Sequence, residues 1–241
     1  METTYIEIDS PDKHLSDVLE EIPSNVILYK TLTGIGATYS EIKAQRHSII
    51  IEPNVPVIIG KCNSAKHKND NLLGVYEGVT TDRIIKYLGA SRGKYYKILT
   101  TPESFTKVKD AFLIFNGKIY NTCFLLIDEA HKTIKDVDYR SDIVLPMNDF
   151  FKFKGKALVS ATPLKFSDPR FEENGFSIIK IEPTYDYAKE IDIKPSTNIL
   201  REVWEEFGWM PFITGQGKDN PYFIFINSVD IIYSIISELK L

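Results

Sequence analysis

The most informative stretch of this 241-residue chain is Phe124-Leu125-Leu126-Ile127-Asp128-Glu129-Ala130-His131. Four apolar residues are followed at once by two acids, which is the pattern of a buried strand that ends in a polar turn. Open α/β sheets bind their ligands at the carboxyl ends of their strands. Acids in that place can serve phosphoryl transfer, with Asp128 holding Mg²⁺ and Glu129 orienting or deprotonating the attacking water. The same acids would also suit the start of a helix, where they complement its dipole.

Short apolar runs recur along the chain, and polar or helical segments separate them. Runs that are apolar throughout are typical of central strands in a parallel sheet, because such strands are covered on both faces. Helices are predicted over Thr81–Leu88 and Asp142–Phe151. The alternation predicts an α/β fold, a parallel sheet flanked by helices. The predicted strands are Val26–Tyr29, Ser48–Ile51, Leu72–Tyr76, Tyr96–Leu99, Phe124–Ile127, Ala157–Val159 and Ile178–Ile181.

The first predicted strand leads into a loop with two glycines, Thr33-Gly34-Ile35-Gly36-Ala37-Thr38, and a helix is expected from Ala37 onward. Glycines allow backbone N–H groups to close around phosphates, and the Thr38 hydroxyl stands where a Mg²⁺ ligand is expected. The phosphate-loop pattern has lysine at the position of Ala37. A hydrogen bond to a charged group is worth about 1.5–3 kcal/mol, so its loss weakens nucleotide binding ten- to a hundredfold unless another cation replaces it. Lys30 is the nearest candidate, and an ordinary turn before a helix is the alternative for the loop.

Polar turns follow three further predicted strands. Ser160-Ala161-Thr162 could sense the γ-phosphate and pass its presence to a second domain, although a Ser/Thr turn closed by Pro163 explains the same residues. Glu52-Pro53-Asn54 and Thr101-Pro102-Glu103 end strands in the same manner. Hydroxyls and helix N-termini at such an edge can hold a nucleic-acid backbone without reading its sequence.

Taken together, the order and spacing of these segments resemble the first RecA-like domain of superfamily 2 helicases and translocases. Asp128–His131 matches the DEAH box of motif II, and Ser160–Thr162 matches the Ser-Ala-Thr of motif III. Thr33–Thr38 matches motif I except at Ala37, while Glu52-Pro53-Asn54 resembles motif Ia and Thr101-Pro102-Glu103 resembles motif Ib. The resemblance implies a RecA-like phosphate-loop NTPase fold, bound ATP and Mg²⁺, and a role for His131 in coupling the ATP site to a second domain.

The domain organisation follows from a change of texture near residue 185. We expect a RecA-like ATP-binding domain over residues 1–184, a linker rich in proline and charge over 185–200, and the incomplete start of a second RecA-like domain over 201–241. A helix over Thr197–Phe207, a strand over Pro221–Ile226 and a helix over Ser228–Leu239 are predicted there. Tyr222–Ser228 resembles motif IV, and the chain is expected to need the remainder of the second RecA-like domain as a partner.

Composition sets broader limits. The net charge of -4 gives no overall electrostatic signature of a nucleic-acid coat protein. No apolar run approaches the ~20 residues that span a bilayer, and the N-terminus has no signal-peptide core, so we expect no membrane partner and a cytoplasmic protein, with a viral or bacterial origin compatible with these features. Cys62 and Cys123 lack metal-type spacing, and Cys123 is expected to be a buried, reduced thiol.

The leading functional hypothesis is an ATP-dependent helicase or translocase that acts on DNA or RNA, with protein partners in a replication or remodelling complex. It requires Thr38 and the pair Asp128–Glu129 to converge at one rim of the sheet and to leave a hollow for a metal-bound triphosphate. Ala37 and the incomplete second domain favour an alternative, a catalytically weakened RecA-like module that binds nucleic acid or protein. A viral DNA-packaging ATPase, which shares the same kinds of motif, is a third possibility.

Overall fold

The structure is a computed structural model, and it describes residues 1–32, 34–135, 144–162, 168–187, 201 and 229–239. The chain divides into two compact units, Met1–Tyr187 and Ala188–Leu241, and each is considered by itself. In the second unit the structure describes α12, Val229–Leu239, where the sequence predicts a helix over Ser228–Leu239. Apart from Arg201, the predicted helix Thr197–Phe207 lies outside the described residues, as do the predicted strand Pro221–Ile226 and the segment that resembles motif IV.

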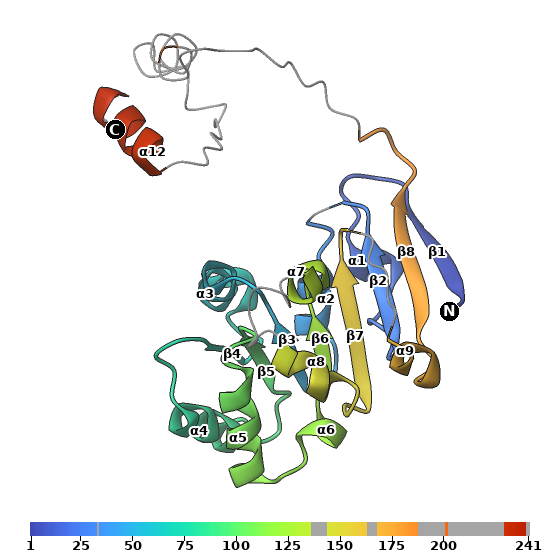
Figure 1. Cartoon of the computed structure of the whole chain (residues 1–241), viewed down its shortest axis with the longest axis vertical. Coiled ribbons are helices and arrows are strands. Elements are labelled where there is room, and N and C mark those ends of the chain that lie inside the picture. The colour runs from blue at the N-terminus through green and yellow to red at the C-terminus, as the bar shows by residue number, and fades with distance from the viewer. Residues whose placement is uncertain (33, 136–143, 163–167, 188–200, 202–228, 240–241) are drawn as a thin grey trace. The chain divides into compact units, whose positions relative to one another are not determined.

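An eight-stranded sheet forms the centre of the first unit, in the order β1-β8-β2-β7-β6-β3-β5-β4 (Figure 1). Every neighbouring pair of strands is parallel. All carboxyl ends therefore lie at one edge, which is the edge where an α/β sheet binds ligands. The strands are β1 Thr3–Ile8, β2 Val26–Lys30, β3 Ser48–Ile51, β4 Leu72–Val75, β5 Lys97–Thr100, β6 Phe124–Ile127, β7 Gly155–Ser160 and β8 Ser177–Pro183.

Helices bury both faces of this sheet. Side chains of one strand alternate between two apolar clusters: Ile49 and Ile51 belong to the first and Ile50 to the second, because successive residues of a strand face opposite sides. Helices α4, α5, α6, α7, α8 and α9 contribute to the first cluster, and α1, α2 and α3 contribute to the second. The helical elements are α1 Leu15–Val18, α2 Ala37–Lys43, α3 Val55–Asn63, the 3₁₀ helix η1 Ala65–His67, α4 Thr81–Ala90, α5 Phe105–Phe115, α6 Ile119–Thr122, α7 Ala130–Lys135, α8 Val144–Phe150 and α9 Arg170–Glu173.

The predicted α/β fold is confirmed, and each predicted strand lies within a residue or two of an observed one, apart from longer ends on β7 and β8. Helix α2 begins at Ala37 as predicted, and α4 begins at the predicted Thr81. Strand β1 was not predicted. It is an edge strand in which Ile8 is the one buried residue, so its sequence lacks the continuous apolar character that marks the central strands.

The environment of the cysteines also agrees with the sequence. Both are free, and Cys123 is buried in the first cluster, where burial raises the pKa of its thiol to about 12. Among the described helices, none combines the length and the apolar character that crossing a bilayer requires.

Gly74 of β4 offers a test of the packing between α3 and the sheet. A Cβ atom at Gly74 would lie 2.9 Å from Cγ2 of Ile58 and 3.2 Å from Sγ of Cys62, both on α3. We expect Gly74→Ala to lower the free energy of unfolding by about 1–3 kcal/mol through overpacking. Gly89→Ala is the control: Gly89 is exposed in α4 with open space around it, and alanine there should raise stability by about 0.5–1 kcal/mol. Urea unfolding of both variants measures the difference, and equal effects would contradict the packing described.

Candidate active site

The candidate site lies where the neighbouring strands β3 and β6 end. Their register pairs Ile51 with Ile127, and the amide of Asp128 donates to the carbonyl of Ile51 at 3.0 Å. The next residue of each strand is an acid, so Glu52 and Asp128 lie side by side at the carboxyl edge of the sheet. Both are buried, with 3% and 5% of their surface exposed. Two adjacent buried carboxylates need cations or hydrogen-bond donors to remain ionised.

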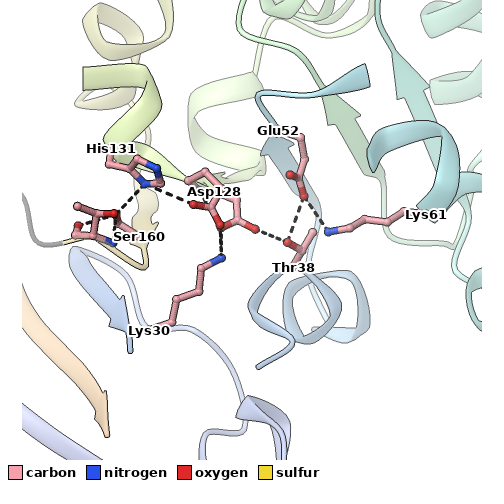
Figure 2. A network of polar contacts seen from close by, with 9 residues as sticks. Lys30, Thr38, Glu52, Lys61, Asp128, His131 and Ser160 are labelled. Carbon is pink, nitrogen blue, oxygen red and sulfur yellow. Dashed lines mark hydrogen bonds and ion pairs between the residues drawn. The ribbon is translucent and has the colours of Figure 1, made fainter. Parts of the chain in front are cut away.

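Thr38 is the first such donor. The loop before it turns through Gly34 and Gly36, whose φ angles of 80° and 88° are readily adopted only by glycine. Thr38 is the second residue of α2, and its Oγ1 donates to Oδ2 of Asp128 at 2.5 Å (Figure 2). The convergence of Thr38 with the acids that the sequence requires is therefore observed.

The Thr38 hydroxyl faces a second acceptor as well. Its Oγ1 lies 3.1 Å from Oε1 of Glu52, and the same Oε1 accepts a hydrogen bond from Nζ of Lys61 on α3 at 2.8 Å. Burial, and then the negative charge of Asp128, raises the pKa of Glu52 above its ordinary 4.5, and Lys61 offsets part of that rise.

Lys30 is the counter-ion that Asp128 and Glu129 share. It is the last residue of β2, and its Nζ lies 3.0 Å from Oδ1 of Asp128 and 2.7 Å from Oε1 of Glu129. Burial alone would lower the pKa of Lys30, but the two carboxylates outweigh it and the pKa rises above 10.5. Burial likewise opposes ionisation of Asp128, yet Lys30 and the Thr38 hydroxyl hold its pKa below 3.8.

Glu129 links the acids to the end of β7. Its backbone is left-handed, with φ of 48°, and its amide donates to Oδ1 of Asp128 at 2.8 Å. Nδ1 of His131 lies 3.3 Å from Oε2 of Glu129 and 3.2 Å from Oγ of Ser160. The Ser160 hydroxyl donates to the carbonyl of Thr162 at 2.7 Å, so its oxygen is left to accept from His131. This assigns the ring proton to Nδ1 and joins Glu129 to Thr162 through hydrogen bonds.

A cavity of about 420 Å³ opens onto these groups. Its volume falls within the range of about 300–1,000 Å³ that is usual for small-ligand sites. Three lysines face three acids across it, which gives the cavity polar walls of both signs. The lining includes the loop residues Gly34, Ile35, Gly36 and Ala37 together with Thr38, Lys30, Lys61, Lys132, Glu52, Pro53, Asp128 and Glu129.

Not all residues assigned to the site from the sequence meet there. Pro53, expected to contact nucleic acid, lines the same cavity as Thr38. Thr101 and Pro102 are buried after β5, one strand beyond β3, and Glu103 is exposed; they do not line this cavity. Thr33 lies outside the described residues.

The sequence pointed to Glu52 only as part of a turn that could contact nucleic acid, not as a partner of Thr38, and it gave no role to Lys61. The signal for Glu52 was present, because an acid directly after a four-residue buried strand is the same pattern that identified Asp128. Lys61 gave no such signal: it lies on α3, and only the fold brings it to Glu52.

Comparison with known proteins adds information on the fold. No family model and no curated protein matches the sequence. Among solved structures, the DUF1998 helicase MrfA matches 90% of this chain and 36% of its own length, with a TM-score of 0.52 and 12% identity. The Hef helicase domain of Pyrococcus furiosus matches 76% of this chain and 42% of its own, with a TM-score of 0.45 and 14% identity. A hypothetical ATP-dependent RNA helicase from Sulfolobus tokodaii matches 65% and 48%, with a TM-score of 0.45 and 16% identity.

At these identities the likeness concerns the fold, and that conclusion depends on MrfA together with the sheet order. The first unit has the RecA-like α/β fold found in helicase domains. The chain spans less than half the length of each of these three proteins.

Substitution of Lys30 tests its role as the common counter-ion. Removing one partner of a buried ion pair costs about 3–5 kcal/mol, so Lys30→Met should lower the free energy of unfolding by that amount at pH 7. Because the pKa of Asp128 is lowered from 3.8 and that of Lys30 is raised from 10.5, the stabilisation is complete between these values and is lost below and above them. Chemical unfolding across pH measures it. Lys132→Met is the control, because Lys132 is an exposed lysine of the same cavity. A difference in stability between the two variants that does not change with pH would contradict the assignment.

Proposed function

We propose that this chain is the ATP-binding part of a superfamily 2 motor of the DEAH-box type, which hydrolyses ATP while bound to DNA or RNA. The supporting observation is the meeting of Thr38, Lys30 and the acids Asp128 and Glu129 around one cavity of about 420 Å³ beside the glycine loop. A domain with a purely structural role needs no such convergence of opposite charges at a ligand-binding edge.

The residues present fit a magnesium nucleotide. Thr38 and Asp128 would hold the metal, because a hydroxyl and a carboxylate are ligands that Mg²⁺ prefers. Thr38 has a single proton for two acceptor oxygens, Oδ2 of Asp128 and Oε1 of Glu52, so oxygen atoms predominate around this hydroxyl. Bound Mg²⁺ would supply the charge neutralisation that phosphoryl transfer requires.

Lys30 takes the role of the missing lysine in this proposal. It sits at the end of β2, seven residues before Ala37, and its ammonium already lines the cavity. A phosphate can exchange with a carboxylate as its partner, because both are anionic acceptors.

Glu129 is assigned to the attacking water. Its side chain is 24% exposed against 7% for Asp128, so water reaches it more readily. Its strained backbone, a non-glycine residue with φ of 48°, is of a kind that clusters at active sites. His131, Ser160 and Thr162 carry the state of Glu129 to the end of β7, which suits the coupling role that the resemblance gives them.

The nucleic-acid track belongs to the same proposal. Thr101, Pro102 and Glu103 follow β5 at the carboxyl edge, and Pro53 follows β3. We expect these turns to contact the backbone of the nucleic acid. A complete second RecA-like domain would close the ATP site, and protein partners of a replication or remodelling complex are expected for the whole molecule.

One observation favours a second candidate, the catalytically weakened binding module. Ala37 removes the usual cation from the loop, and Lys30 is paired with both acids at once. A cation held this firmly by two carboxylates stabilises the nucleotide-free protein, which weakens its attraction for phosphate.

Nucleotide binding and hydrolysis distinguish the two candidates. ATP with Mg²⁺ at about 100 times its Kd should stabilise the protein by about 2.7 kcal/mol and raise the Tm by about 5–10 °C. Glu129→Gln should keep this shift but abolish ATP hydrolysis stimulated by DNA or RNA in the intact protein, because it removes only the group that handles water. A shift without turnover above the Glu129→Gln background, or no shift at all, would contradict the motor and favour the binding module.

The replacement of the loop lysine by Lys30 has its own test. We expect Lys30→Met to weaken ATP binding ten- to a hundredfold, the value of a hydrogen bond to a charged group. Equilibrium titration with a fluorescent nucleotide measures the affinity, with Lys132→Met as the matched variant from the same cavity. Unchanged affinity in Lys30→Met would remove Lys30 from this role, and a larger loss in Lys132→Met would transfer the role to that residue.

A further inference from the structure

We infer that Glu52 is a positioning residue: it accepts the hydroxyl proton of Thr38 and so leaves the oxygen of Thr38 and the carboxylate of Asp128 free to face a divalent cation. The inference rests on the proposed function, since it concerns how the same site takes its metal. It assigns to the nucleotide side of the domain a residue that sequence reasoning placed next to a nucleic-acid contact.

Glu52 is held where this role requires it. The register of β3 on β6 fixes it beside Asp128, and its amide is bound to the carbonyl of Thr100 at 2.9 Å. Its side chain is 4% exposed, and its Oε1 lies 3.1 Å from Oγ1 of Thr38 (Figure 2). The carboxylate of Glu52 is therefore part of the buried site and is not a surface charge.

Lys61 decides which group donates in this contact. Its Nζ lies 2.8 Å from Oε1 of Glu52, and an ammonium group donates but does not accept. Oε1 therefore acts as an acceptor toward Lys61 and cannot carry a proton directed at Thr38. The contact between Oε1 and Thr38 is a hydrogen bond only when the threonine hydroxyl donates.

Thr38 consequently has one proton and two acceptors. In the arrangement described, the shorter contact, 2.5 Å to Oδ2 of Asp128, takes the proton, and the 3.1 Å contact to Glu52 is left without one. Rotation of the hydroxyl hydrogen toward Glu52 reverses this assignment, and the oxygens of Thr38 and Asp128 then move apart, because two oxygens 2.5 Å from each other repel when no proton lies between them. The lone pairs of Thr38 and the Oδ2 atom of Asp128 are then both free of protons, and both residues line the same cavity.

A purely structural role for Glu52, as the partner of Lys61, makes a different prediction. In that case removal of Glu52 lowers the free energy of unfolding, and the affinities for the cation and for the nucleotide change by the same factor. In the inferred role, Glu52 acts through Thr38. Removal of Glu52 therefore lowers the affinity for the cation alone, and it has no effect in a variant whose residue 38 lacks a hydroxyl.

The experiment uses the full chain with ADP and Mn²⁺, a paramagnetic probe for Mg²⁺ whose free form is counted by electron paramagnetic resonance. Mn²⁺ affinity of the ADP complex, and ADP affinity in the presence of a chelator, are measured for wild type, Glu52→Ala, Thr38→Val and the double variant. Glu52→Gln, which keeps the volume and one acceptor oxygen, serves if Glu52→Ala does not fold. Glu41→Gln is the control, since Glu41 is also a buried carboxylate that accepts from a hydroxyl, that of Ser48 at 2.5 Å, but lies outside the cavity.

We expect Glu52→Ala to reduce Mn²⁺ affinity about tenfold and to leave metal-free ADP affinity unchanged, with a smaller reduction in Glu52→Gln and none in Glu41→Gln. In the Thr38→Val background, Glu52→Ala should change Mn²⁺ affinity less than about twofold. Wild-type Mn²⁺ affinity in the Glu52 variants, or losses that multiply in the double variant, would overturn the inference while leaving the proposed function in place. Failure of the wild type to bind ADP with or without Mn²⁺ would remove the proposed function and the inference with it.

Discussion

Charge compensation beneath the carboxyl edge of the sheet is the constraint on which the site depends. Adjacent parallel strands end in Glu52 and Asp128, and the burial of two like charges side by side costs several kcal/mol unless each has a counter-ion. Lys30 supplies one counter-ion from β2, two strands away from β6, and Lys61 supplies the other from α3, which packs on β4. The cavity owes its mixed walls to this arrangement.

The positive charge beside Asp128 comes from a strand and not from the glycine loop, where position 37 is alanine. A lysine at position 37 would extend from the start of a helix that follows two flexible glycines. Lys30 instead extends from β2, and this strand is hydrogen-bonded to β7 on one side and to β8 on the other. The position of this charge is therefore fixed by the sheet itself.

Much of the first unit follows from the sequence because its central strands are apolar throughout and end in polar residues, as at Ile127 followed by Asp128. Periodicity and turn chemistry carry that information. Strand β1 escaped notice since an edge strand needs little apolar surface, and Lys61 escaped because α3 reaches Glu52 only in three dimensions. The role of Glu52 was predictable, because it repeats the pattern of Asp128 on the neighbouring strand. Asp128 belongs to a recognisable DEAH motif, whereas a single glutamate after a strand does not identify a site.

The place of β8 between β1 and β2 has a consequence for synthesis of the protein. Thr3 pairs with Ile178, so the first strand made has no neighbour until the last strand of the unit is available. On a ribosome that adds about 5–20 residues per second, the N-terminal segment stays unpaired for many seconds while the rest of the sheet assembles. Pairing of β1 therefore cannot precede the synthesis of β8, and β1 waits longer for its neighbour than any other strand of this sheet.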